Sequence, residues 1–267
     1  MKRALIALLT VPLLTSGCAA LMDKAMDAAS DRAGNIIGDA IGDRVGNAAA
    51  GQATAELDAL SPQMTQAYAL GLFSVLFYNG GYAWDTNAYK VGDYTQWTGT
   101  DMGQGDFFEK ALLSRDAQGR EWWRVRAQQH EDGKVKEAAF EAFFSAPDAN
   151  GGRKILRMRA KLPNQTRANE VPITEENQAG WVLRPRAKLT AESLQGATVG
   201  VEGISVAAGT YQARHVRYAY GAGSIDWWLS NQVPGGLVKY TVTGGDGKKA
   251  GSLQLYKVGT GAKPMLQ

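Results

Sequence analysis

The period of hydrophobic and polar positions changes along the chain, and each change marks a different kind of element. From Met64 to Tyr78 nearly every position is apolar, which is typical of a helix that is enclosed on all sides. Ser61-Pro62 is a start signal for this helix, and Asn79-Gly80-Gly81 is a stop signal. Because a bilayer requires about 20 apolar residues, the run is too short to span one. We therefore expect a buried helix.

From Val91 onward the chain reads as short strands separated by turns. Turns rich in Asp, Asn and Gly recur at strand-length intervals, which predicts consecutive antiparallel hairpins. Alternation is clearest in Lys154–Lys161, where Leu156, Met158 and Ala160 are expected to share one face of the strand. The polar segment Asn164–Asn177 is expected to be a loop. The predicted strands are Phe107–Arg115, Arg120–Gln129, Lys134–Ser145, Arg153–Leu162, Gly180–Arg184, Ala197–Val206, Thr210–Tyr220, Ile225–Ser230, Leu237–Thr243 and Ser252–Val258.

About ten strands are many for one open sheet unless the sheet curls. A curled sheet around the Met64–Tyr78 helix covers the apolar surfaces of both. The predicted fold class is therefore α+β, mainly antiparallel β: a half-barrel of about ten strands around an apolar helix. The predicted divisions are residues 1–17 as a signal peptide, 18–60 as a Gly-rich tether, 61–260 as the helix and β domain, and 261–267 as a tail.

The first residues predict export. The positive start at Lys2 and Arg3 and the apolar run Ala4–Leu14 form a secretory signal. The sequence Ser16-Gly17-Cys18 resembles a bacterial lipoprotein lipobox. This resemblance implies cleavage before Cys18 and lipidation of its thiol, so that the membrane is a partner through acyl chains. Ala19 is not the Asp that commonly retains such proteins at the inner membrane, which implies the periplasmic side of the outer membrane. A cleaved signal with a chance cysteine is the alternative.

A four-residue repeat within the tether places Gly34, Gly38, Gly42 and Gly46 on one face of a helix. Each glycine lowers helix stability by about 1 kcal/mol relative to alanine. The repeat resembles a glycine zipper, which implies helix packing against a second copy, an envelope protein or the membrane. A flexible tether between the anchor and the domain explains the same glycines. Both interpretations stay open.

Composition narrows the functional classes. Cys18 is the single cysteine, so an exported chain has no internal disulfide. Removing Lys2 and Arg3 with the signal lowers the formal net charge from +3 to +1, and no nucleic-acid partner is implied. His130 and His215 are the only histidines, and no spacing suggests a third ligand for a metal. Nucleophile, zinc and phosphate-loop motifs are absent. We predict no enzyme activity, no metal and no cofactor.

Five segments in order carry a second resemblance: Val91–Tyr94, Gly119–Trp123, Val206–Tyr211, Ile225–Ser230 and Val233–Tyr240. They resemble envelope proteins related to the periplasmic lipoprotein-carrier and receptor half-barrels. The resemblance implies a curved antiparallel sheet that wraps one or more helices and a concave apolar face that can hold acyl chains. It assigns no catalytic residue.

The leading hypothesis is non-catalytic binding or handling of a lipid or other apolar ligand in the concave face. The pattern selects Trp123, Leu156, Met158 and Trp228 as ligand-binding candidates. In each pair, Trp122-Trp123 and Trp227-Trp228, one ring should be buried, and core packing is the commoner role for such a ring. The lipid hypothesis fails if the helix fills the concavity. The chain is then a structural or interaction module that self-associates or binds protein through the Gly34–Gly46 repeat.

Overall fold

The computed structural model describes residues 69, 73, 77, 88–99, 102–131, 133–149, 152–162, 165–173, 182–183, 191–220 and 222–266. The signal, Cys18, the Gly34–Gly46 repeat and the rest of the tether lie outside these residues and stay predictions. In the part of the chain that is described, no helix has the length and apolar character needed to cross a membrane.

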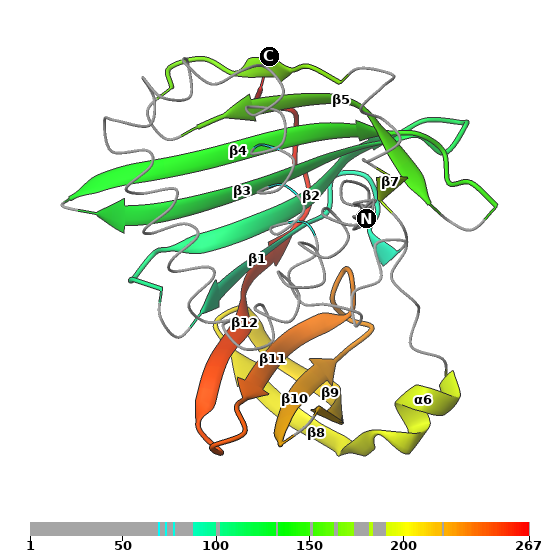
Figure 1. Cartoon of the computed structure of the whole chain (residues 1–267), viewed down its shortest axis with the longest axis vertical. Coiled ribbons are helices and arrows are strands. Elements are labelled where there is room, and N and C mark those ends of the chain that lie inside the picture. Colours follow the sequence, from blue (N-terminus) through cyan, green and yellow to red (C-terminus); the bar gives the residue numbers. More distant parts are fainter. Residues whose placement is uncertain are drawn as a thin grey trace, which may run out of the picture.

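The described strands form one curved antiparallel sheet of twelve, in which two meanders meet at a single strand pair. The sheet order is β6-β5-β4-β3-β2-β1-β12-β11-β10-β9-β8, and β7 pairs with β5. Figure 1 shows the two groups one above the other, joined where β12 lies beside β1. The strands are β1 (Tyr94–Gly99), β2 (Phe107–Arg115), β3 (Glu121–Glu131), β4 (Lys134–Phe144), β5 (Arg153–Lys161), β6 (Asn169–Val171), β7 (Val182–Leu183), β8 (Thr198–Val206), β9 (Gly209–Tyr220), β10 (Gly223–Leu229), β11 (Leu237–Thr243) and β12 (Lys249–Gly259).

The predicted fold class is confirmed, and the bounds of β2 and β11 coincide with the predicted strands. One correction concerns β6, which lies within the segment Asn164–Asn177 that was expected to be a loop. Its three residues are too few to show alternation, and β6 exists because it pairs with β5, with Val171 opposite Met158. The short helix α6 (Ala191–Gly196) was also not predicted.

A β-bulge corrects the assignment of faces on β5. Ile155 and Met158 are buried in the core, whereas Leu156 is only partly buried. Between these two core residues, the pairing with β4 shifts by one residue, from Ile155 opposite Phe144 to Arg157 opposite Phe143. An extra residue on one strand reverses the alternation at that point. The prediction that Leu156 shares a face with Met158 and Ala160 was therefore wrong.

Candidate functional site

The concave face of the sheet is occupied by helical residues from the predicted Met64–Tyr78 segment. Ala69, Phe73 and Phe77 are helical and buried, and their spacing of four places them on one side of a helix. The Phe77 ring centroid lies 5.3 Å from that of Trp123 and 5.5 Å from that of Phe144. Phe73 and Phe77 stack on each other at 5.3 Å. At these positions the chain's own aromatic rings fill the space that a ligand would need.

A buried lysine connects this helix to the sheet. Lys110 on β2 is 0% exposed, and its Nζ donates a hydrogen bond to the backbone carbonyl of Phe77. The same Nζ lies 4.8 Å from the centroid of the Phe77 ring. An ammonium group is costly to bury without polar partners, and the carbonyl of Phe77 is one such partner. Lys110 therefore stabilises the docked helix.

The four residues predicted to bind a ligand are not brought together on one open surface. Trp123 and Met158 are 1% and 0% exposed and belong to the packed core. Leu156 lies at the bulge on β5 and is partly buried. Trp228 is partly buried on β10, beside the buried Trp227. The expectation that one ring of each tryptophan pair is buried is confirmed.

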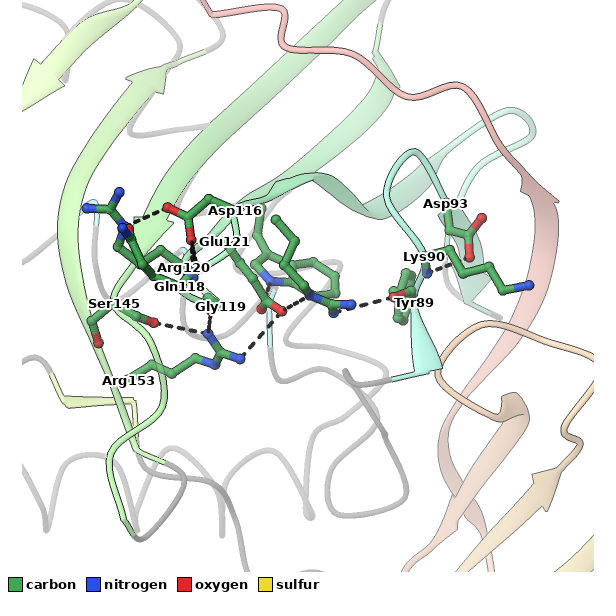
Figure 2. Close-up of polar contacts among 12 residues, drawn as sticks. Tyr89, Lys90, Asp93, Asp116, Gln118, Gly119, Arg120, Glu121, Ser145 and Arg153 are labelled. Carbon is green, nitrogen blue, oxygen red and sulfur yellow. Dashed lines mark hydrogen bonds and ion pairs between the residues drawn. The ribbon is translucent and has the colours of Figure 1, made fainter.

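A polar network surrounds Glu121 beside the β2–β3 turn (Figure 2). Glu121 accepts hydrogen bonds from the Nε of Arg115 at 2.7 Å and from the indole N–H of Trp123 at 2.8 Å. A guanidinium nitrogen of Arg153 lies 3.4 Å from the same carboxylate. Arg153 also donates to the carbonyl of Gly119 at 2.8 Å and to that of Ser145 at 3.0 Å. These contacts tie the β2–β3 and β4–β5 turns together at one end of the sheet.

Asp116 organises the turn itself. Its carboxylate accepts backbone N–H bonds from Gln118 at 3.0 Å and Arg120 at 2.9 Å, and a side-chain bond from Arg120 at 2.6 Å. Desolvation acts to raise the pKa of Asp116, but these hydrogen bonds and the charge of Arg120 outweigh it and hold the pKa below its ordinary value. Gly119 closes the turn at a positive φ of 78°, which favours glycine.

The convex face of β1–β4 carries a buried ionic cluster around Glu109. The Glu109 side chain is 2% exposed and lies 2.9 Å from Arg124 and 3.0 Å from Arg126. Gln96 donates to it at 2.7 Å, and Arg126 also pairs with Glu137 at 3.0 Å. Burial acts to raise the pKa of Glu109, but hydrogen bonding and charge from Arg126, together with Arg124, lower it overall. The cluster links strands that are adjacent in the sheet.

The C-terminal residues Thr260–Leu266, which we call the C-terminal strap, cross this convex face. Figure 1 shows the segment running from β12 behind β1–β5. The Ala262 N–H donates to the Gly92 carbonyl at 2.9 Å, and Arg124 donates to the Lys263 carbonyl at 2.5 Å. Glu141 accepts from the backbone N–H groups of Met265 at 2.7 Å and Leu266 at 3.3 Å. Residues predicted as a tail thus lie against the sheet.

A second polar cluster surrounds Trp228, on the face of β10 opposite to Trp227. The Trp228 ring stacks on His215 with centroids 4.5 Å apart, and the Nζ of Lys239 lies 4.9 Å from the Trp228 centroid. The indole N–H donates to Glu202 at 2.6 Å. His215 also contacts Asp226 at 2.6 Å through its Nε2. Trp228 is therefore held by polar partners, and it packs against the core without being one of its buried residues.

The two histidines lie in separate places. His130 contacts Asp106 at 3.0 Å through its Nδ1, whereas His215 lies in the cluster around Trp228. Among the residues that the structure describes, no group of three His, Cys, Asp or Glu side chains is arranged to hold a metal ion.

Sequence reasoning missed Lys110, which contacts the helix, Glu141, which contacts the strap, and Glu109, which pairs with Arg124 and Arg126. On β2 both faces are covered, so seven consecutive residues from Phe107 to Leu113 are buried and two of them are charged. The clue in the sequence was the pair Glu109-Lys110 inside an apolar run. The alternation of polar and apolar residues along a single strand does not show whether such a pair is buried or exposed to solvent. Buried charges of this kind are retained only with partners, and the partners come from distant parts of the chain.

Comparisons with known proteins find no matching family model and no matching curated protein. Solved structures with a similar arrangement include a chain of the MucA–MucB complex of Pseudomonas aeruginosa, with a TM-score of 0.38 and 12% identity over 72% of this chain and 59% of that chain. A candidate lipoprotein from Parabacteroides distasonis gives a TM-score of 0.30 and 10% identity over 67% and 98% of the respective chains. A candidate exported protein from Bacteroides fragilis with a YmcC-like fold gives 0.31 and 9% over 64% and 97%. The chain therefore spans 59% of the matched MucA–MucB chain.

Proposed function

We propose that the chain is a non-catalytic interaction module of the cell envelope, anchored to the membrane by a lipid on Cys18. The signal sequence and the lipobox resemblance support the periplasmic side of the outer membrane as its location. The Gly34–Gly46 repeat is a second contact element, through self-association or binding of an envelope protein. In this proposal, partners are bound by the outer surfaces of the half-barrel and by the tether.

The observation that carries the proposal is the helix in the concavity. Phe73 and Phe77 are buried against the sheet, and Lys110 donates to the carbonyl of Phe77 from a fully buried position. An acyl chain in the same place would have to displace these rings and leave the Lys110 ammonium without that acceptor. Both changes oppose binding. Contact with other proteins through the exterior requires neither change.

A non-catalytic role is supported by how the buried acids are used. Glu109 pairs with arginines, Glu121 holds arginines and an indole, and Glu141 accepts backbone N–H groups of the strap. Asp226 lies between His215 and Arg217. Each of these carboxylates has a structural partner at hydrogen-bond distance. General acid–base chemistry requires a carboxylate that faces a substrate.

Native mass spectrometry tests the proposal against lipid carriage. The chain from Ser61 onward, exported behind a cleavable signal and purified without detergent, should have the mass of the polypeptide alone. A lipid extract of the same sample should contain no stoichiometric lipid, because the helix occupies the concave face. One retained lipid per chain would reject the interaction module in favour of the lipid-binding hypothesis. An unrelated exported domain purified in parallel reports background lipid.

A further inference from the structure

The C-terminal strap is held almost entirely through its backbone. Arg124 and Arg159 donate to the carbonyls of Lys263 and Leu266, the second at 2.6 Å, and Glu141 accepts the N–H groups of Met265 and Leu266. Three charged side chains, one each on β3, β4 and β5, thus form hydrogen bonds with the peptide groups of the strap. Such contacts do not depend on the side chains of the bound segment.

One side chain of the strap is an exception. Leu266 is 2% exposed, whereas Lys263, Pro264 and Met265 are exposed. The site therefore combines polar partners for an extended backbone with an enclosed position for one aliphatic residue. Glu141 is 1% exposed, and a carboxylate so buried requires hydrogen-bond donors. Without an extended segment over it, Glu141 would lose the two backbone donors that the strap supplies.

We propose that this convex surface, formed by Arg124, Glu141 and Arg159, is a binding site for an extended segment of a partner protein. In this structure the chain's own strap occupies it. The incoming segment supplies two carbonyls to the arginines, two N–H groups to Glu141 and a large aliphatic residue at the place of Leu266. The inference rests on the proposed function and names the site and the class of partner. The partner segment is thus expected to make the same backbone contacts as the strap and to place its aliphatic side chain where Leu266 lies.

Binding in trans competes with the strap in cis. A covalently attached segment acts at an effective concentration on the order of millimolar, so a free peptide binds the intact chain weakly. Substituting Leu266 removes the buried side-chain contact from the strap and leaves the three charged residues in place. A peptide that carries the native leucine should then displace the weakened strap from its site.

The test uses the full chain and a synthetic peptide of residues Thr260–Leu266, amidated at its C-terminus and fluorescently labelled at its N-terminus. Fluorescence anisotropy should show that the peptide binds the Leu266→Ser chain about tenfold more tightly, or better, than the wild-type chain. Adding Glu141→Gln to the Leu266→Ser chain should abolish this gain. Adding Glu192→Gln, on exposed α6, should leave it unchanged. A peptide with serine in place of Leu266 should bind more weakly.

Circular dichroism verifies that each variant is folded, and Leu266→Ala replaces Leu266→Ser if the serine variant is not. Equal peptide binding by folded wild-type and Leu266-substituted chains would overturn the proposal. Binding that persists in the Glu141→Gln variant would also overturn it, because the peptide would then be bound elsewhere. Either failure is separate from that of the proposed function, which is decided by co-purifying lipid.

Discussion

Replacing Phe77 with alanine should lower the free energy of unfolding by about 3–5 kcal/mol, as is usual when a buried aromatic side chain is truncated. Phe77 contacts Phe73, Trp123 and Phe144 through its ring, and Lys110 lies over the same ring. The truncation removes these contacts together and leaves a cavity between helix and sheet. Urea unfolding followed by circular dichroism measures the change.

The matched control is Val135→Ala on β4, because Val135 is 58% exposed. An exposed aliphatic side chain should contribute within about 0.5 kcal/mol. If Phe77→Ala is as stable as Val135→Ala, the helix does not hold the concave face, and the basis of the proposed function is lost.

The Glu109→Gln variant should lose about 3 kcal/mol at neutral pH, the lower part of the range for breaking a buried ion pair. The substitution leaves Arg124 buried beside a neutral amide, while Arg126 keeps Glu137 as a partner. Equilibrium unfolding at pH 7 measures this loss. The control is Glu170→Gln, which removes the ion pairs of Glu170 with Arg157 and Arg159 at the surface. This substitution should change the free energy of unfolding by only about 0–1 kcal/mol.

The same variant makes a prediction about pH. The folded-state pKa of Glu109 lies below the ordinary value of 4.5, so its contribution to stability is present above pH 4.5. That contribution is lost as the pH falls through the lower folded-state pKa. The wild-type chain should therefore lose stability more steeply below pH 4.5 than Glu109→Gln does. Asp116, whose pKa is also lowered, keeps part of the acid dependence in the variant. Parallel pH profiles for the two proteins would contradict the assignment.

Much of the fold was predictable because it depends on local patterns. Most strands were located by the Asp, Asn and Gly residues of the turns and by the alternation of polar and apolar residues between those turns. The all-apolar run Met64–Tyr78 indicated an enclosed helix, and three residues of this run are buried in the core. The joining of β1 to β12 was not predictable, since these strands lie far apart in the chain. The bulge at Leu156 was missed because one extra residue leaves no mark on composition.

The candidate site was less predictable than the fold. Trp123 and Met158, two of the four ligand-binding candidates, are buried in the core, and the sequence could not show that helical Phe73 and Phe77 pack in the same core. Glu141 and Arg159 gave no signal as strap-binding residues, because their partners are backbone groups of Met265 and Leu266. Backbone recognition leaves no motif in the ligand segment. A site built from it can be found only once the strands are in register.

Hydrogen–deuterium exchange of the segment that contains Ala69, Phe73 and Phe77 tests the central claim most directly. We predict that its amides exchange as slowly as those of β4, and that added phospholipid leaves their exchange unchanged, because the helix stays in the concave face. Exchange as fast as that of an unstructured peptide, or release of the segment when phospholipid is added, would contradict the account. The concave face would then be open to an acyl chain, and lipid handling would replace the interaction module as the function.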